Sequence, residues 1–264
     1  MVQLYDDIGR GYRVYRRPDP RIAALVAGAL GPASTVVNVG AGAGSYEPAG
    51  RAVVAVEPSR AMIAQRPAGS APVVQASATA LPFADGSFAA ALAVLTVHHW
   101  PDRLGGLREL ARVARERVVV LTWDPGAPGF WLVEEYFPEI AVLDRPIFPS
   151  LDDFHRALGP IEVKPVPIPH DCTDGFLGAY WRRPAAYLDA GVRGAISTFT
   201  KLADSAPGVA RLRRDLDDGT WIRRHADLLD RLELDLGYRL VVAERAGLPA
   251  AVPSRAGAGS NGGG

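Results

Sequence analysis

The sequence contains very little cysteine and lysine. Among its 264 residues there is a single cysteine, Cys172, and the only lysines are Lys164 and Lys201. One cysteine excludes an internal disulfide and a zinc site with several thiolate ligands, so the cysteine content does not require an oxidising compartment. Neither lysine lies between a glycine and a serine or threonine, which excludes a P-loop for nucleotide phosphates.

A surplus of charge of one sign and a long hydrophobic run are also missing. The 29 basic and 29 acidic residues give a formal net charge of +0, which leaves no broad basic field for nucleic acid. The longest apolar run, residues 88–97, has about half the length that a membrane-spanning helix needs. Asp6 and Asp7 lie in a segment without the apolar core of a signal peptide. We therefore expect a cytoplasmic protein with no nucleic-acid or membrane partner.

Apolar residues make up 48% of the chain, and this fraction and the length suit one large domain with a sizeable core. Short apolar runs typical of strands alternate with segments of helical periodicity. The runs are 36–39, 52–56, 73–74, 89–97 and 117–123, and the helical segments are 20–30, 61–65 and 102–115. Strands that are apolar throughout and separated by helices predict a parallel sheet covered on both faces.

The pattern changes after residue 124. A capped helix is predicted at 150–159, an edge strand with prolines at 161–168, a helical stretch at 174–231 and a last strand at 238–243. The predicted organisation is an N-terminal lid segment and helix at 1–32, a core at 33–124, helices and an edge strand at 125–170, a helical cap at 171–231, the last strand at 232–246, and a disordered tail at 247–264.

A glycine-rich loop with Gly40, Gly42 and Gly44 follows the first predicted strand. Open α/β sheets bind ligands at the carboxyl ends of their strands, and glycine lets the backbone approach a ligand closely. Glu57 ends the next strand and is the expected acceptor for two ribose hydroxyls. This order of strand, loop, strand and carboxylate predicts a cofactor that carries a nucleoside.

Two details bear on which cofactor this is. The dinucleotide fingerprint places Gly or Ala at its sixth position, where this chain has Ser45. Pro160 and Ser197 stand four residues before the two lysines, so the Tyr-x-x-x-Lys pair of short-chain dehydrogenases is missing. A nicotinamide-dependent oxidoreductase is therefore the less favoured alternative.

Residues 36–44, 55–59, 80–88 and 95–100 form four motifs in a characteristic order. They resemble the successive motifs of class I S-adenosylmethionine-dependent methyltransferases, and their arrangement is similar to the UbiE-like small-molecule branch. The resemblance covers about residues 1–124. It implies an α/β fold with a Rossmann-like, seven-stranded, mostly parallel sheet whose last strand is antiparallel, and we place the helical cap before that strand.

The resemblance also implies an activity. Such an enzyme transfers a methyl group from S-adenosyl-L-methionine to an O, N or C atom of a small-molecule acceptor and releases S-adenosyl-L-homocysteine. A protein that binds the same cofactor without methyl transfer is the alternative. No pattern in the sequence indicates an oligomeric state.

Each residue that matches a family motif is assigned a role by the resemblance. The glycines would lie beneath the methionine moiety, Glu57 would hold the ribose, and Met62 would give an apolar contact to the adenine. The implied cofactor-binding residues are Gly40, Gly42, Gly44, Glu57, Pro58, Ser59, Met62, Ser77, Ala78 and Leu95. Two positions depart from the family, which usually has Asp where this chain has Ser77 and often has Asp where it has Asn38. A hydroxyl accepts a hydrogen bond without charge, so we expect weaker anchoring of the adenine.

The candidate residues for catalysis follow the fourth predicted strand. Most candidates for acceptor binding lie outside the predicted core at 33–124. His98 and His99 come immediately after that strand, near the expected methyl group, and imidazole titrates near neutrality, so either is a candidate base, with His99 preferred. The alternative is that both shape the cofactor pocket. The predicted substrate-pocket residues are Tyr12, Trp100, Trp123, His170, Tyr180 and Trp181.

For several of these positions, taken singly, a structural role is the favoured interpretation. Tyr180 and Trp181 would then pack the insertion against the sheet. Arg16 could meet a carboxylate or be solvated. We expect no metal site, because the two adjacent histidines lack a third ligand.

Overall fold

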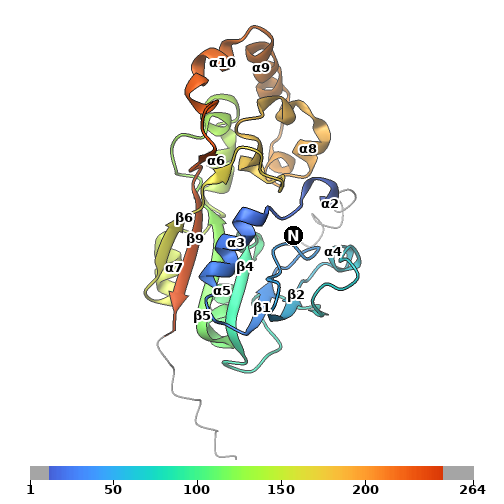
Figure 1. The fold of residues 1–264 in the computed structure, drawn as a ribbon, viewed down its shortest axis with the longest axis vertical. Coiled ribbons are helices and arrows are strands. Elements are labelled where there is room, and N and C mark those ends of the chain that lie inside the picture. Colours follow the sequence, from blue (N-terminus) through green and yellow to red (C-terminus); the bar gives the residue numbers. More distant parts are fainter. Residues whose placement is uncertain (1–11, 246–264) are drawn as a thin grey trace, which may run out of the picture.

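A seven-stranded sheet forms the centre of the molecule, for which the computed structural model describes residues 12–245 (Figure 1). Its strand order is β3-β2-β1-β4-β5-β9-β6. The strands are β1 (Thr35–Val39), β2 (Ala52–Val56), β3 (Val73–Val74), β4 (Phe88–Val94), β5 (Ala114–Trp123), β6 (Glu162–Pro165) and β9 (Tyr238–Glu244). Strands β1 to β5 run parallel, whereas β9 is antiparallel to both β5 and β6. The predicted Rossmann-like fold is confirmed.

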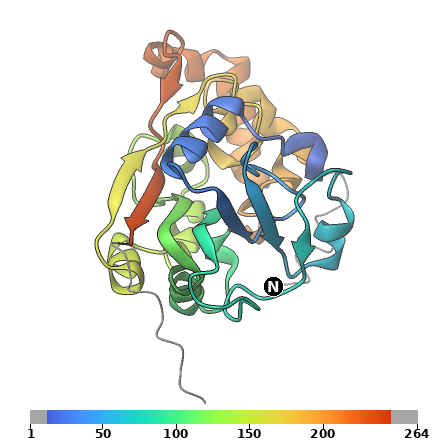
Figure 2. The same cartoon turned by 60° about the horizontal axis from the view of Figure 1, so that its bottom comes forward.

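Helices cover both faces of this sheet (Figures 1 and 2). On one face, α3 (Pro20–Ala29) packs Ile22 and Val26 against the sheet. On the other face, α5 (Arg103–Val113) and α7 (Leu151–Leu158) pack their own buried residues against it. The short α4 (Arg60–Ala64) follows β2. Side chains of β5 alternate between these two cores, and those of β1 and β4 are almost all buried. Burial on both faces explains why the strands are apolar throughout.

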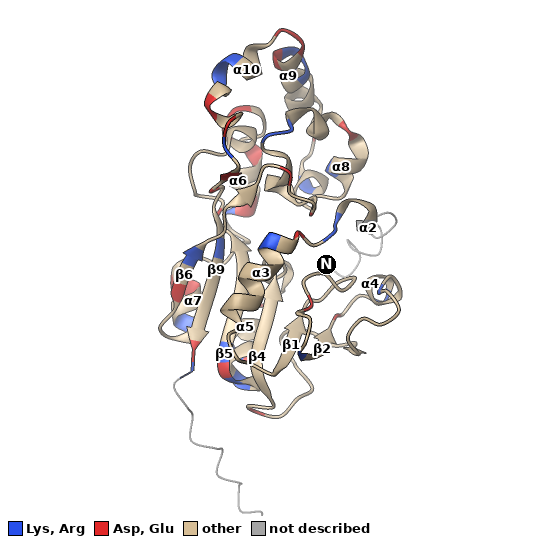
Figure 3. Ribbon diagram, viewed as in Figure 1, with Lys and Arg blue, Asp and Glu red and all other residues tan. Residues whose placement is uncertain are grey.

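A helical cap stands over the carboxyl ends of the parallel strands (Figure 1). It contains α6 (Glu139–Asp144), α8 (Ala190–Gly194), α9 (Ala206–Asp217) and α10 (Thr220–Arg224). A small sheet of β7 (Ile168–Pro169) and β8 (Glu233–Leu234) connects to it, and α2 (Tyr12–Tyr15) lies beside it. Figure 3 shows basic and acidic segments next to one another on α9 and α10, so charges of both signs are interspersed there.

The cap differs from the predicted continuous helical stretch. Residues 174–231 form several short helices and helical turns, because Pro184 and Pro207 each stand in the first turn of a new helix. Trp131, from the segment before α6, packs edge-on against Trp221 of α10 with ring centroids 5.2 Å apart. The cap core is thus built from chain segments on both sides of β6. The predicted edge strand at 161–168 is also divided, since β6 ends at Pro165 and β7 begins at Ile168 in the other sheet.

A buried carboxylate fixes the start of α3. The Asp19 side chain is fully buried and accepts hydrogen bonds from the Arg21 N–H at 3.0 Å and the Thr173 N–H at 3.1 Å. Burial alone would raise the pKa of Asp19, but the hydrogen bonds from Arg21 and Thr173 lower it to about 2. Asp19 therefore caps the helix and also joins it to the cap-side segment that contains Thr173.

We predict that Asp19→Ala lowers the free energy of unfolding by about 2–3 kcal/mol, because it removes an N-cap and a buried carboxylate that accepts from Thr173 and pairs with the half-exposed Arg21. The matched control is Asp102→Ala, since Asp102 caps α5 with an exposed side chain and should cost only about 1 kcal/mol. Urea unfolding of both variants measures the difference. Equal losses would mean that the contact with Thr173 adds nothing to the cap.

The same carboxylate predicts a dependence on pH. Its folded pKa lies below the ordinary value of 3.8, so its stabilising contribution is present above that value and is lost as pH falls towards about 2. Asp19→Ala should therefore lose less stability than the unchanged chain between about pH 4 and pH 2. Urea midpoints measured across this range that fall in parallel for both proteins would contradict the prediction.

Candidate functional site

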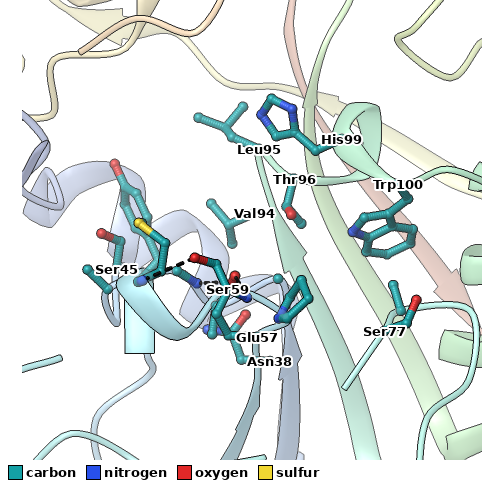
Figure 4. A pocket seen from close by; sticks show the side chains of 18 of the residues that line it. Asn38, Ser45, Glu57, Ser59, Ser77, Val94, Leu95, Thr96, His99 and Trp100 are labelled. Carbon is teal, nitrogen blue, oxygen red and sulfur yellow. Dashed lines mark hydrogen bonds between the residues drawn. The ribbon is translucent and has the colours of Figure 1, made fainter. Parts of the chain in front are cut away.

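A cavity of about 370 Å³ opens at the carboxyl ends of β1, β2 and β4. We call it the first cavity; Figure 4 shows its wall. The structure places on this wall the predicted residues Gly40, Gly42, Glu57, Pro58, Ser59, Met62, Ser77, Ala78 and Leu95. Gly44 does not line it, although its φ of 95° fits the same tight loop. Thus the segments that carry the sequence motifs meet around one space.

The glycine loop keeps its shape through backbone bonds and a close contact. The Gly40 and Ala41 N–H groups both donate to the Val56 carbonyl of β2. Gly40 has a φ of 72°, and a Cβ there would lie 2.1 Å from the Thr96 Oγ1. Only glycine tolerates this conformation and this approach. The loop therefore turns tightly at the end of β1, next to Thr96, without a side chain at Gly40.

The Glu57 carboxylate is the best-defined polar group of the first cavity. It is 6% exposed, and it accepts hydrogen bonds from the Gly42 N–H at 2.8 Å and the Ser59 N–H at 2.9 Å. Burial raises the pKa of Glu57 above its ordinary value, while these two bonds and the charge of Arg66 oppose the rise. Each carboxylate oxygen keeps further capacity to accept a hydrogen bond, which two adjacent hydroxyls of a ribose could use.

Asn38 shows that the first cavity suits a polar ligand. Its side chain comes from the buried strand β1 and lines the cavity beside Glu57 (Figure 4). The Nδ2 atom is buried and has no hydrogen-bond partner among residues 12–245. A buried donor without a partner is costly unless a ligand or water accepts from it. The site therefore fits a cofactor with an acceptor group close to the end of β1.

The backbone is strained at the end of β4. Leu95 has a φ of 49°, a conformation that is rare for residues other than glycine, and its N–H donates to the Leu121 carbonyl of β5 at 2.8 Å. Such strain persists only where surrounding structure imposes it, and it is common at functional sites. The turn that it starts sends the chain into the helical turn Val97–His99, which carries both candidate bases.

The two histidines occupy different positions. His99 lines the first cavity, whereas His98 is stacked on Phe148 with ring centroids 4.0 Å apart. Burial lowers the pKa of His99 to about 3, and the positive charges of Lys201 and Arg16 contribute to this. Burial, followed by the charge effect of His99, Lys201 and Arg16, holds the pKa of His98 well below its ordinary value. Both imidazoles are therefore neutral at neutral pH.

A smaller cavity of about 50 Å³ adjoins the first one, and we call it the second cavity. Arg16, Leu95 and His99 line both, so the two spaces meet at these residues. Aromatic side chains form much of the second wall, together with hydroxyl and aliphatic groups. Its other lining residues are His98, Trp123, Phe148, Phe176, Leu177, Ile196, Ser197, Thr198 and Tyr238. It therefore lies between the end of the sheet and the cap.

The predicted substrate-pocket residues are distributed over several places. Trp100 lines the first cavity and Trp123 the second. Trp181 is fully buried, donates its Nε1–H to the Ile168 carbonyl at 2.9 Å, and packs in the cap. Tyr180 and His170 line neither described cavity. The side chain of Tyr12 lies outside the part that the structure describes.

Sequence reasoning missed several aromatic residues of the second cavity. Tyr238 begins β9 and pairs in register with Trp123 at the end of β5. Antiparallel pairing of the last strand with β5 would have placed it there. Phe148 and Phe176 come from irregular segments whose position no local pattern indicates.

Among residues 12–245, no group of three or more His, Cys, Asp or Glu side chains is arranged to hold a metal ion. Within the same range, no helix is both long enough and apolar enough to cross a bilayer.

Comparisons with known proteins were made for the whole chain. Residues 37–122 match a family model described as a methyltransferase domain. A search of curated proteins found no match. A solved structure from Anabaena variabilis, described as a methyltransferase from an antibiotic biosynthesis pathway, is 33% identical with a TM-score of 0.79, and the match covers 87% of this chain and 98% of that chain.

Two more distant structures have the same fold. An S-adenosylmethionine-dependent methyltransferase from Thermotoga maritima is 15% identical with a TM-score of 0.55, over 93% of this chain and 100% of that chain. The YcgJ protein from Bacillus subtilis is 18% identical with a TM-score of 0.51, over 84% and 97%. The family model and the similarity to the Anabaena protein over most of both chains show that this chain belongs to the class I S-adenosylmethionine-dependent methyltransferases, in agreement with its UbiE-like motifs.

Proposed function

We propose that this chain binds S-adenosyl-L-methionine in the first cavity and transfers its methyl group to a small molecule held where this cavity meets the second. The observation that carries the proposal is the junction of the two cavities at Arg16, Leu95 and His99. Methyl transfer requires alignment of an acceptor with the cofactor in a space shielded from water. A cofactor cavity that continues into a smaller, aromatic cavity under a cap meets this requirement.

The cofactor half of the proposal rests on Glu57 and its neighbours. The Glu57 carboxylate would accept from the ribose hydroxyls, and the Asn38 Nδ2 would donate to an acceptor of the amino-acid part. Met62 and Ala78 supply apolar surface for the adenine. The Ser77 hydroxyl, where the family usually has Asp, lies 2.9 Å from the Thr79 hydroxyl, so it already has a partner within the protein. We therefore propose weaker polar recognition of the adenine than in relatives with Asp.

When bound, S-adenosyl-L-methionine would supply a methyl group on a sulfonium: the acceptor atom would form a bond to the methyl carbon while the carbon–sulfur bond breaks, and S-adenosyl-L-homocysteine would be the leaving group. The contribution of the chain is to position the acceptor, exclude water and receive a proton where the acceptor carries one. His99 is the proposed group for this proton, because it lines both cavities and its neutral ring keeps a lone pair. His98 is the second candidate, and its stacking on Phe148 also restrains the turn.

Glu57→Ala should weaken the binding of S-adenosyl-L-homocysteine about ten-fold or more, because charge-assisted hydrogen bonds to the ribose are lost. Isothermal titration calorimetry measures the affinity. The affinity of Glu57→Gln should fall between that of the unchanged chain and that of Glu57→Ala, since Gln keeps one acceptor oxygen. Glu109→Ala is the matched control: this carboxylate also accepts from a backbone N–H, that of Leu81 at 2.9 Å, but lies outside the cavity. An unchanged affinity in Glu57→Ala would place the cofactor elsewhere.

The rings of His98 and His99 should stay neutral from about pH 8 down to about pH 5, because burial holds their pKa below the ordinary value of 6.5. NMR titration of the imidazole C–H signals tests this, with His98→Gln and His99→Gln used to assign the two signals. A midpoint near the ordinary value for either ring would contradict the described burial and remove the reason for its lone pair at neutral pH.

Incubation with methyl-labelled S-adenosyl-L-methionine and fractionated small-molecule extracts tests the transfer itself. The proposal predicts label in a small molecule together with formation of S-adenosyl-L-homocysteine. Binding of the cofactor without transfer to any fraction would favour the alternative of a cofactor-binding protein. Calorimetric binding of NADH or NADPH in place of S-adenosyl-L-homocysteine would favour the oxidoreductase alternative.

A further inference from the structure

The second cavity has an uneven distribution of charge. Among the described residues on its wall there is one permanently charged side chain, Arg16, and no carboxylate. The remaining polar groups are the two neutral imidazoles and the hydroxyls of Ser197, Thr198 and Tyr238. The rest of the wall is aromatic or aliphatic. A ligand of this cavity would therefore meet a cation and hydrogen-bonding groups next to flat apolar surfaces.

Arg16 is held firmly in place. Its Nε–H donates to the Asp174 Oδ1 at 2.6 Å, and the backbones of the same two residues form a β-bridge. The Asp174 side chain is 2% exposed and also accepts from the Tyr46 hydroxyl at 3.0 Å. This carboxylate lines neither cavity, while the Arg16 side chain lines both. Of the two residues in this ion pair, Arg16 therefore lines the cavities, whereas Asp174 lies outside both of them.

A second ion pair lies near the second cavity but outside its wall. Lys201 lies 3.6 Å from Asp144, a fully buried carboxylate that also accepts from the Thr198 hydroxyl at 2.7 Å. Neither Lys201 nor Asp144 lines a described cavity. Lys201 and Arg16 both lower the pKa of His99, after the larger effect of burial. Among the described residues, Arg16 is therefore the charged group that a ligand of the second cavity would contact.

We propose that the methyl acceptor is a small molecule with a flat apolar body and an anionic oxygen group, a carboxylate or a phenolate, and that Arg16 binds this group where the two cavities meet. The inference rests on the proposed function, since it assigns the ligand of the second cavity. Arginine binds anionic oxygens strongly in partly buried sites, and aromatic walls suit a flat body. A cationic amine would meet repulsion from Arg16, and no described residue on the wall of the second cavity supplies a carboxylate to receive it.

The test uses protein saturated with S-adenosyl-L-homocysteine and matched pairs of acids and amides. The pairs are acetate and acetamide, benzoate and benzamide, and indole-3-acetate and indole-3-acetamide, which cover a range of sizes. The proposal predicts that at least one acid binds about ten-fold more tightly than its amide, measured by isothermal titration calorimetry. Amides that bind as well as their acids, or no acid that binds, would overturn it.

Variants of the Arg16–Asp174 ion pair should change the affinity for the acid in opposite directions. Asp174→Asn removes the charge that neutralises Arg16, so it should raise the affinity for the acid several-fold. The double variant Arg16→Gln with Asp174→Asn removes both charges together, avoids an unpaired buried carboxylate, and should abolish the preference for acid over amide. Arg17→Gln is the matched control, because Arg17 is exposed and lines neither cavity. General damage to the fold would not raise affinity in one variant and lower it in the other.

These results can be separated from failure of the proposed function. If S-adenosyl-L-homocysteine does not bind the unchanged protein, the proposed cofactor site is wrong. If it binds and the acids show no preference that depends on Arg16, only the inference about the acceptor is wrong.

Discussion

The buried carboxylate of Asp174 joins three parts of the chain that are distant in sequence. It pairs with Arg16 from the segment before α3 and accepts from Tyr46 beyond the glycine loop, while its own position is at the start of the segment that leads into the cap. A buried carboxylate needs such partners, because an unpaired charge in this place would cost several kcal/mol. Satisfying Asp174 therefore brings the N-terminal segment, the glycine loop and the cap to one point. The two cavities meet beside that point, at Arg16.

The first cavity depends on local features, which is why its position could be predicted from the sequence. Parallel strands end at one edge of the sheet, so the residues that follow β1, β2 and β4 are brought together by topology alone. Gly40 has to be glycine because of its φ and the nearby Thr96, and Glu57 directly follows β2, at the expected place. The fold class followed from the same alternation of strands and helices.

The second cavity depends on contacts between distant segments, and its residues were mostly missed. Phe148, Phe176 and Thr198 come from turns whose positions are set by packing of the cap on the sheet. Trp181 had two interpretations, a pocket residue or a packing residue, and its side chain lies in the core of the cap, as the packing interpretation predicts. Prolines within 174–231 divided a stretch whose helical composition alone predicts a longer helix.

The central claim is that the two cavities are one reaction site, with the cofactor in the first and its reactive end at the junction. A crystal structure with bound S-adenosyl-L-homocysteine tests this most directly. We expect the ribose hydroxyls to donate to the Glu57 carboxylate and the amino-acid part to lie near Asn38. The sulfur atom should face the space between Leu95, His99 and Arg16. A sulfur atom that faces away from the second cavity, or a ligand bound outside the first, would contradict it.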